Sequence, residues 1–97
     1  MATYLLLGNF TEQGIRAVKD TTKRAETLAK IGKKTGVMVK EVFWILGQFD
    51  VAAILDAPDD ASVTAFGLSV GKLGNVRTQT LRAFRAEEMG EILGKLA

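Results

Sequence analysis

The chain has 97 residues, of which 47% are hydrophobic and 25% are charged, and its formal net charge at pH 7 is +2. This length and composition predict a single globular domain over residues 1–97 with one modest core. The sequence contains no cysteine and no histidine, which excludes disulfides, Cys or His metal sites and nucleophilic catalysis by Ser/His/Asp or Cys/His groups. We therefore expect no metal site and no cofactor, and any proton transfer would depend on Asp, Glu, Lys or Tyr4.

The apolar runs are too short, and the basic residues too few, for membrane or nucleic-acid binding. No apolar run approaches the roughly 20 residues that a membrane-spanning helix needs, and the start of the chain, MATYLLLGNF, lacks the basic region of a signal peptide. The densest basic stretch, KRAETLAKIGKK (23–34), has no interleaved aromatic residues for base stacking and is typical of a solvated helix face. We expect a cytoplasmic protein with no membrane or nucleic-acid partner.

The first part of the chain predicts a strand followed by a broken helix. TYLLLGNF (3–10) is a short apolar run that ends at Gly-Asn, which is typical of a buried strand. Thr11 can cap a helix, but one continuous helix up to residue 34 would be about 35 Å long and would overrun the strand. Because residues 20–22 (DTT) are good capping residues, we expect a short first helix and a longer second helix that ends near Thr35-Gly36.

The middle of the chain predicts a hairpin and then a helix. In FWILGQFDVAAIL (43–55) two apolar runs flank Gly-Gln-Phe-Asp, which predicts strands over residues 39–46 and 51–55. Asp59 and Asp60 are acidic residues that favour a helix N-terminus. This helix would end at Gly74 and would bury an apolar stripe formed by Val63, Phe66, Val70 and Leu73.

The end of the chain predicts a fourth strand and a terminal helix. Residues 75–84 alternate between two faces, with Thr78 and Arg82 on one face and Arg77 and Leu81 on the other. The tail then has apolar residues at helical spacing, acidic residues early and a lysine late, so we expect a terminal helix docked on the domain. The apolar positions are Met89, Ile92, Leu93 and Leu96.

The order strand, helix, hairpin, helix, strand predicts the α+β ferredoxin-like βαββαβ arrangement, here with a C-terminal helix. All helices would cover one sheet face, and the other face of a monomer should be polar. Residues of both parities are nevertheless apolar in LLL (5–7), VFWIL (42–46) and VAAIL (51–55). We expect a second copy of the chain to cover the open face, which gives a homodimer or a higher homo-oligomer.

Three segments resemble one another: LGNF (7–10), LGQF (46–49) and LGNV (73–76). The expected topology places all three at one end of the sheet, where Gly and Asn are typical of tight turns. Turn geometry alone can explain these residues, and a polar binding rim is the functional alternative. The candidate ligand-binding residues are Asn9, Thr11, Trp44, Phe49, Asp50, Asn75, Arg77 and Arg82.

The chemistry of these candidates indicates a small anion. The guanidinium group of Arg77 offers a planar fork of donors suited to a carboxylate or a phosphate. As an alternative, Asp50 and Arg77 pair with each other or cap local backbone groups. Trp44 and Phe49 can likewise have either a structural or a ligand-binding role. Aromatic residues in a core or an interface are commoner than aromatic ligand platforms.

Several motifs together resemble the GYD domain family of small bacterial proteins. They are GNFTEQGI (8–15), a tryptophan ahead of GQFD (47–50), the APDD turn (57–60) and GNVRTQTLRAF (74–84). The family's Gly-x-Tyr-Asp signature is carried here by Gly47, Gln48, Phe49 and Asp50, so a phenylalanine replaces the usual tyrosine. The family is similar in fold class to dimeric α+β barrels, which implies an assembly paired through the sheets. The resemblance implies no established activity.

Three functions stay open at this point, and the sequence favours the first. The first is a non-enzymatic oligomeric module that binds a small anionic metabolite, as the effector domains of leucine-responsive regulators do on a similar fold. The second is a cofactor-free enzyme of the dimeric α+β barrel type, like a monooxygenase or an isomerase, with Asp50 as its base and Arg77 or Arg82 as its anion holder. The third is a structural assembly protein that works only through its interfaces.

Overall fold

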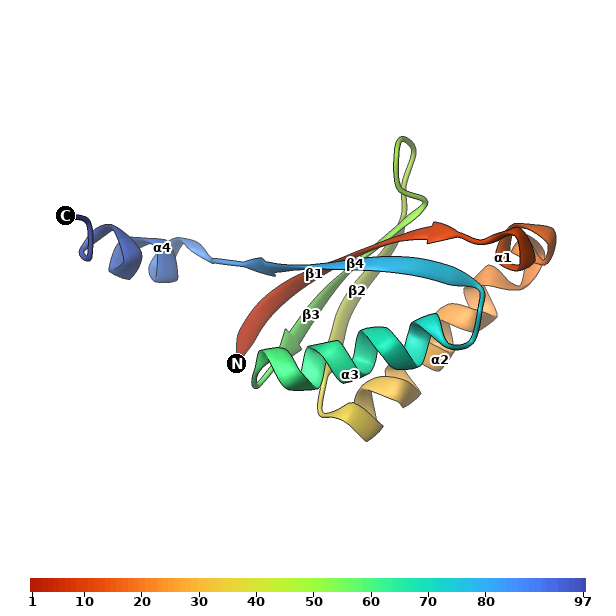
Figure 1. The fold of residues 1–97 in the computed structure, drawn as a ribbon, viewed down its shortest axis with the longest axis horizontal. Coiled ribbons are helices and arrows are strands. Elements are labelled where there is room, and N and C mark those ends of the chain that lie inside the picture. The colour runs from red at the N-terminus through yellow and green to blue at the C-terminus, as the bar shows by residue number, and fades with distance from the viewer.

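The computed structural model describes residues 1–97 and contains one four-stranded sheet with two helices against one of its faces (Figure 1). The elements follow one another in the order that the sequence predicted. They are β1 (Ala2–Phe10), α1 (Glu12–Arg16), the 3-10 helix η1 (Val18–Asp20), α2 (Thr21–Thr35), β2 (Met38–Trp44), β3 (Val51–Ala57), α3 (Asp60–Gly71), β4 (Val76–Ala83) and α4 (Ala86–Leu93).

The sheet has the order β2-β3-β1-β4, and every neighbouring pair of strands is antiparallel. β1 therefore lies at the centre, with Leu5 paired to Ile54 of β3 on one side and to Leu81 of β4 on the other. This order and the two helical connections are those of the ferredoxin-like α+β fold, which confirms the fold class predicted from the sequence.

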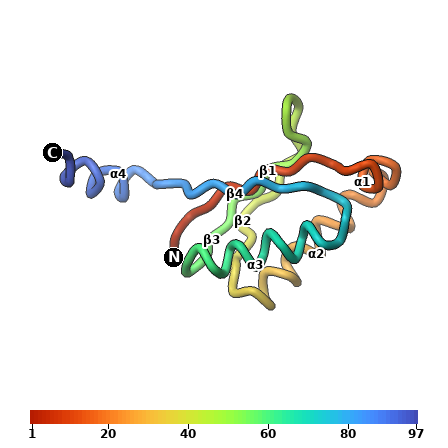
Figure 2. The backbone as a smooth tube through the Cα atoms, viewed as in Figure 1, coloured from red at the N-terminus to blue at the C-terminus, as the bar shows by residue number.

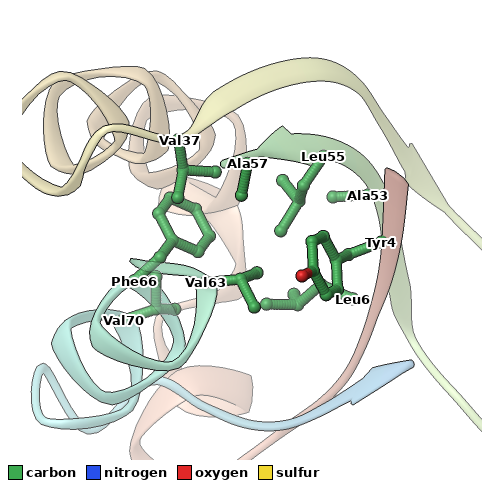
Figure 3. Close-up of a cluster of buried hydrophobic side chains, with 9 residues drawn as sticks. All are labelled: Tyr4, Leu6, Val37, Ala53, Leu55, Ala57, Val63, Phe66 and Val70. Atoms are coloured by element: carbon green, nitrogen blue, oxygen red, sulfur yellow. The ribbon is translucent and has the colours of Figure 1, made fainter. Parts of the chain in front are cut away.

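Helices α2 and α3 pack against each other on the same side of the sheet, α2 over β2 and α3 over β4 (Figure 2). The core lies between these helices and the sheet (Figure 3), and Phe66 of α3 and Leu55 of β3 are fully buried in it. Side chains of alternate parity on each strand point to opposite faces, so the core takes only one parity from β1 and one from β3. The nine core residues are Tyr4, Leu6, Val37, Ala53, Leu55, Ala57, Val63, Phe66 and Val70.

The helix boundaries follow local capping chemistry. Thr11 caps α1, because its Oγ1 accepts a hydrogen bond from the backbone N–H of Gly14 at 3.0 Å. The predicted break in the first helical region is confirmed: α2 begins at Thr21 and ends before Gly36, which has a φ of 80°. Asp59 caps α3 by accepting from the N–H of Ser62 at 2.8 Å.

Several element ends differ from the prediction by one to three residues; for example, β3 continues to Ala57 rather than ending at residue 55. Two of the differences change the exposure of apolar residues. The second strand ends at Trp44 rather than at residue 46, and Leu46 is fully exposed in the hairpin turn. α3 ends at Gly71 rather than at Gly74, so Leu73 lies beyond the helix and is 49% exposed instead of buried. In both cases the apolar residues continue the sequence pattern of the strand or helix beyond the residue at which that element ends.

The terminal helix forms, but the prediction that it docks on the domain is wrong. α4 projects past the end of the sheet, away from α2 and α3 (Figure 1), and Leu93 is 54% exposed. Arg82 and Glu88 form an ion pair at 2.7 Å, and Arg85 Nε donates to Thr3 Oγ1 at 3.2 Å, so both contacts tie the base of the helix to the sheet. An apolar stripe indicates that a helix buries one face, but it does not say against which surface.

Candidate functional site

The three Leu-Gly turns meet at one end of the sheet, as the sequence predicted. The N–H of Asp50 donates to the carbonyl of Gly8 at 2.9 Å, which joins the hairpin to the end of β1. The N–H of Thr11 donates to the carbonyl of Asn75 at 3.0 Å, which joins the third turn to the first. We call this end of the sheet, residues 7–11, 45–50 and 73–77, the turn rim.

Asp50 holds the turn rim together through its side chain and its backbone. Its carboxylate Oδ2 accepts from the N–H of Phe10 at 2.9 Å, and its carbonyl accepts from the N–H of Ile45 at 2.8 Å. Hydrogen bonds to an ionised carboxylate are stronger than those between neutral groups. Of the two structural alternatives considered from the sequence, the geometry shows backbone capping by Asp50 and no ion pair with Arg77.

Thr11 and Asn75 serve the same structural purpose on the other side of the turn rim. Thr11 Oγ1 donates to the carbonyl of Gly74 at 2.5 Å, in addition to capping α1. The side chain of Asn75 accepts from Gln13 Nε2 at 3.0 Å. A Cβ atom on Gly14 would lie 1.9 Å from the carbonyl oxygen of Asn75, so the start of α1 and the third turn are in direct backbone contact. The side chains of Thr11 and Asn75, both predicted site residues, therefore make hydrogen bonds that stabilise the local structure.

Arg77 pairs with Asn9 through the β1–β4 ladder, and its side chain lies on the outward side of the turn rim, where it forms no ion pair and no hydrogen bond within the chain. With Asn9, Phe49 and Gln79 it borders an open, shallow hollow of about 320 Å³. The Nδ2 of Asn9 donates to the hairpin carbonyl of Gln48 at 3.0 Å, and its buried Oδ1 has no partner. The structure thus brings three predicted site residues, Asn9, Phe49 and Arg77, around one hollow.

Trp44 lies on the opposite, helix-covered face of the sheet, away from Arg77. Its Nε1 donates to Oγ1 of Thr21, the first residue of α2, at 3.0 Å. Beneath α2 lies a mainly apolar space of about 70 Å³, which we call the inner cavity, and both Trp44 and Asn75 line it. Arg24 of α2 also lines this cavity, and sequence reasoning missed it because its position depends on how α2 crosses the sheet.

Arg82 lies near the far end of β4, five residues beyond Arg77, and does not join the turn rim. Its guanidinium pairs with Glu88 at 2.7 Å, donates to the carbonyl of Thr3 at 3.3 Å and lies over the rings of Tyr4 and Phe84. These contacts engage the guanidinium group of Arg82, which the sequence analysis named as an alternative anion-binding group. The predicted residues therefore do not form one constellation.

The sheet face that points away from α2 and α3 has no cover within the chain. Alternation in the strands places apolar side chains there, and Leu5, Phe43 and Leu81 are 37%, 46% and 37% exposed. Glu41 and Gln79 add polar groups toward its edges. We call this surface the open sheet face; its apolar residues are Leu5, Leu7, Phe43, Ala52, Ile54 and Leu81.

The molecule as a whole exposes more surface than a compact monomer of its mass. Its accessible area is 6573 Å², about 1,100 Å² more than expected for a folded monomer of 10.5 kDa. Its radius of gyration is 14.5 Å, against about 12.5 Å for a compact domain of this length. The projecting α4 and the open sheet face account for this shape.

Three titratable groups, Tyr4, Asp59 and Glu88, have shifted pKa values. The hydrogen bond from the backbone N–H of Ser62 lowers the pKa of Asp59 below its ordinary 3.8. Tyr4 donates to Asp60 Oδ1 at 2.6 Å, and this hydrogen bond together with burial raises the pKa of Tyr4 above its ordinary 10.0. The hydrogen bond from Arg82 lowers the pKa of Glu88 below its ordinary 4.5.

No group of three or more acidic residues lies close enough together to hold a metal ion. None of the helices has both the length and the apolar character needed to cross a membrane.

Comparison with known proteins places the chain in a family. The model of the GYD domain matches residues 4–93, nearly the whole chain. The chain is also 28% identical over 90 residues to a Thermus thermophilus protein named "Glutamine synthetase and cystathionine beta-lyase binding protein". That alignment covers 92% of this chain and 95% of the relative. The predicted resemblance is confirmed, and the chain belongs to the GYD domain family.

Proposed function

We propose that this protein is a non-enzymatic binding protein that acts as a homo-oligomer and recognises a partner protein. The observation that carries the proposal is the open sheet face, an apolar surface without cover in the chain. Large exposed apolar patches on small proteins are typical of interaction sites. The open sheet face and the projecting α4 together account for the excess area of about 1,100 Å², which is of the same order as the roughly 800 Å² that each partner contributes to a standard interface.

A second copy of the chain is the best cover for the open sheet face. Leu5, Ile54 and Leu81 form an apolar row across its centre, so two such faces can pack as the layers of a sandwich do. Glu41 pairs with Ile54 on the edge strand, where a polar group can stay in water at the margin of the interface. This pairing is the dimeric α+β barrel assembly that the sequence led us to expect.

The partner of this assembly is a metabolic enzyme in our proposal. The relative from Thermus thermophilus is named for binding to glutamine synthetase and cystathionine beta-lyase. α4 offers a surface for such a partner, because Met89 and Leu93 are 43% and 54% exposed and Glu88 anchors the helix base to Arg82. Self-association and partner binding would then use different surfaces.

The test measures mass and partner binding separately. Light scattering should give the parent protein a mass of at least two chains, and Ile54→Lys should reduce it to one, because a charge would enter the interface. Biolayer interferometry should show binding to glutamine synthetase or cystathionine beta-lyase from the same organism. Leu93→Asp should abolish that binding and keep the oligomer. The exposed control Lys95→Asp should keep at least about half of the parent affinity.

Each half of the proposal has its own contradicting result. A parent protein that remains a folded monomer at micromolar concentration overturns the self-association. An oligomer that binds neither enzyme overturns the choice of partner. Binding that is equally strong in Leu93→Asp moves the contact from α4 to another surface.

A small anionic metabolite is the second candidate ligand, and the free guanidinium of Arg77 favours it. Arg77 borders the turn-rim hollow with Asn9 and Phe49, and no carboxylate of the chain neutralises it. Phosphate or citrate should raise the melting temperature of the parent, and Arg77→Ala should remove the rise. The hypothesis of a cofactor-free enzyme has less support. The carboxylate of Asp50, its proposed base, already accepts a hydrogen bond from the N–H of Phe10.

A further inference from the structure

The inner cavity is a separate space from the turn-rim hollow, on the other face of the sheet. It lies between α2 and the rim end of the sheet, next to the core cluster shown in Figure 3. Its volume of about 70 Å³ is about half that of an apolar cavity of about 150 Å³ that binds benzene. The inner cavity is also open to solvent on one side, so it can hold an isobutyl group, or part of a phenyl ring whose remainder lies at the opening.

The cavity wall favours an apolar occupant over water. Of the 15 residues that line it, 11 are hydrophobic, and they include Leu28 and Ile31 from α2 and Leu6 and Val51 from the sheet. A buried water molecule needs two to four polar partners, and a cavity with an apolar wall supplies few. An apolar group would gain contacts with side chains on several sides.

Arg24 is the only charged residue that lines the cavity. Its guanidinium donates to the carbonyls of Ala17 at 3.0 Å and Gly14 at 3.2 Å, and it forms no ion pair. A guanidinium group has five N–H donors, so donors remain for a further acceptor. A carboxylate is the acceptor that matches this planar fork best.

We propose that the inner cavity binds a small carboxylic acid with an aromatic or branched aliphatic body. The body fills the cavity against Leu28 and Ile31, and the carboxylate pairs with Arg24. Trp44 and Thr21, which are hydrogen-bonded to each other, form part of the wall. This site is independent of the proposed partner enzyme and of the hollow beside Arg77.

Trp44 provides a direct readout, because it is the only tryptophan in the chain and lines the cavity. The experiment titrates the protein with phenylacetate and follows the emission of Trp44 and the melting temperature. Phenylacetate should change the emission saturably and raise the melting temperature. Acetate has the charge without the body, and phenylacetamide has the body without the charge; both should bind at least about tenfold more weakly.

Two variants locate the ligand. Ala25 lines the cavity, so Ala25→Phe should fill it and remove phenylacetate binding while the far-UV circular dichroism stays that of the parent. Arg24→Met keeps the apolar stem of the side chain and should remove the preference for phenylacetate over phenylacetamide. Arg77→Ala should leave the response unchanged, which separates this site from the turn-rim hollow.

The outcomes decide the proposal in either direction. An emission that does not respond to phenylacetate in the folded parent overturns it. So does a folded Ala25→Phe variant that binds as tightly as the parent, since the ligand would then lie elsewhere. If Arg24→Met fails to fold, the comparison of phenylacetate with phenylacetamide on the parent decides the role of the charge by itself.

Discussion

At the scale of single residues, the turn rim depends on side chains that replace missing backbone contacts. The carboxylate of Asp50 accepts the N–H of Phe10, and Thr11 Oγ1 contacts both Gly14 N–H and the carbonyl of Gly74. Each of these groups lies where one element ends and the next has not begun, so no regular ladder or helix can satisfy it. The family motif residues at these positions therefore have a structural reason to be there.

Replacement of Asp50 should measure that contribution. Asp50→Ala leaves the N–H of Phe10 without its charged acceptor, and we expect the free energy of unfolding to fall by about 1–2 kcal/mol. Asp20→Ala is the matched control, because Asp20 is exposed and its side chain makes no capping hydrogen bond. Urea unfolding checks both, and an Asp50 variant as stable as the control would contradict the capping role.

A methyl group at Gly14 should be far more disruptive than one at another helical glycine. Gly14→Ala would place Cβ 1.9 Å from the carbonyl oxygen of Asn75, which must move, and we expect a loss of about 1–3 kcal/mol or more. Gly90 of α4 has no neighbouring atom within 4 Å of such a Cβ, so Gly90→Ala should stabilise the helix by about 0.5–1 kcal/mol. Equal effects in thermal unfolding would contradict the close contact.

At the scale of elements, each strand presents one parity to α2 and α3 and the other to the open sheet face. β3 shows this alternation clearly, with Ala53 and Leu55 in the core and Ala52 and Ile54 outside. β2 breaks the alternation through a register irregularity between Val39 and Glu41, as a β-bulge does.

Neighbouring lysines in β3 should therefore have different effects. Ala53→Lys places a charge in the core, where Ala53 is only 3% exposed, and should destabilise the fold by several kcal/mol. Ala52→Lys places the charge on the open sheet face and should mainly dissociate the oligomer. Urea unfolding and light scattering on both variants check the two effects, and a reversed pattern would mean that the faces are exchanged.

The anchor of α4 should depend on pH through Glu88. Because the hydrogen bond from Arg82 lowers the pKa of Glu88, the contribution of this contact is present above the ordinary carboxyl pKa of 4.5 and is lost as the pH falls through the lowered value. The protection of the amides of residues 86–93 against exchange, measured by NMR relative to the intrinsic exchange rate at each pH, should fall in that acidic range. Glu88→Gln should remove the pH step, and the control Glu91→Gln should keep it.

At the scale of the whole molecule, one chain leaves much of its apolar surface in water. Only 13 of 97 residues are buried, and α4 extends the longest dimension to 50 Å (Figure 1). A core of this size gives modest stability to a domain of about 100 residues. Burial of the open sheet face in an assembly would add to it.

The melting temperature should therefore depend on protein concentration. When association accompanies folding, dilution favours the unfolded monomer, and each tenfold dilution removes about 1.4 kcal/mol of stabilisation per mole of dimer. Differential scanning calorimetry over a hundredfold concentration range should show a falling melting temperature for the parent. The Ile54→Lys variant should show no such dependence, and a parent without it would contradict coupled folding and association.

The sequence predicted the fold well and the site only in part. The caps Thr11 and Asp59 and the left-handed Gly36 mark helix ends where the sequence predicted them, because capping is a local interaction that the sequence displays directly. The break before Thr21 was also predicted, although Asp20 makes no capping hydrogen bond there. The meeting of the three turns followed from the topology. The sequence could not predict that the candidate site residues would lie on different faces of the sheet. Trp44 and Arg77 lie on opposite faces because of the register in which the strands pair.

The sequence by itself determined the helix and strand order, the ferredoxin-like class, the family and the absence of histidine and cysteine chemistry. The tertiary structure alone decided which strand parity meets the helices, that Asp50 caps Phe10 instead of pairing with Arg77, and that α4 leaves the domain. The physical reason is distance along the chain. Caps and periodicity involve residues within a few positions of one another, whereas these features depend on contacts between distant segments, where a shift of one residue moves a side chain to the other face.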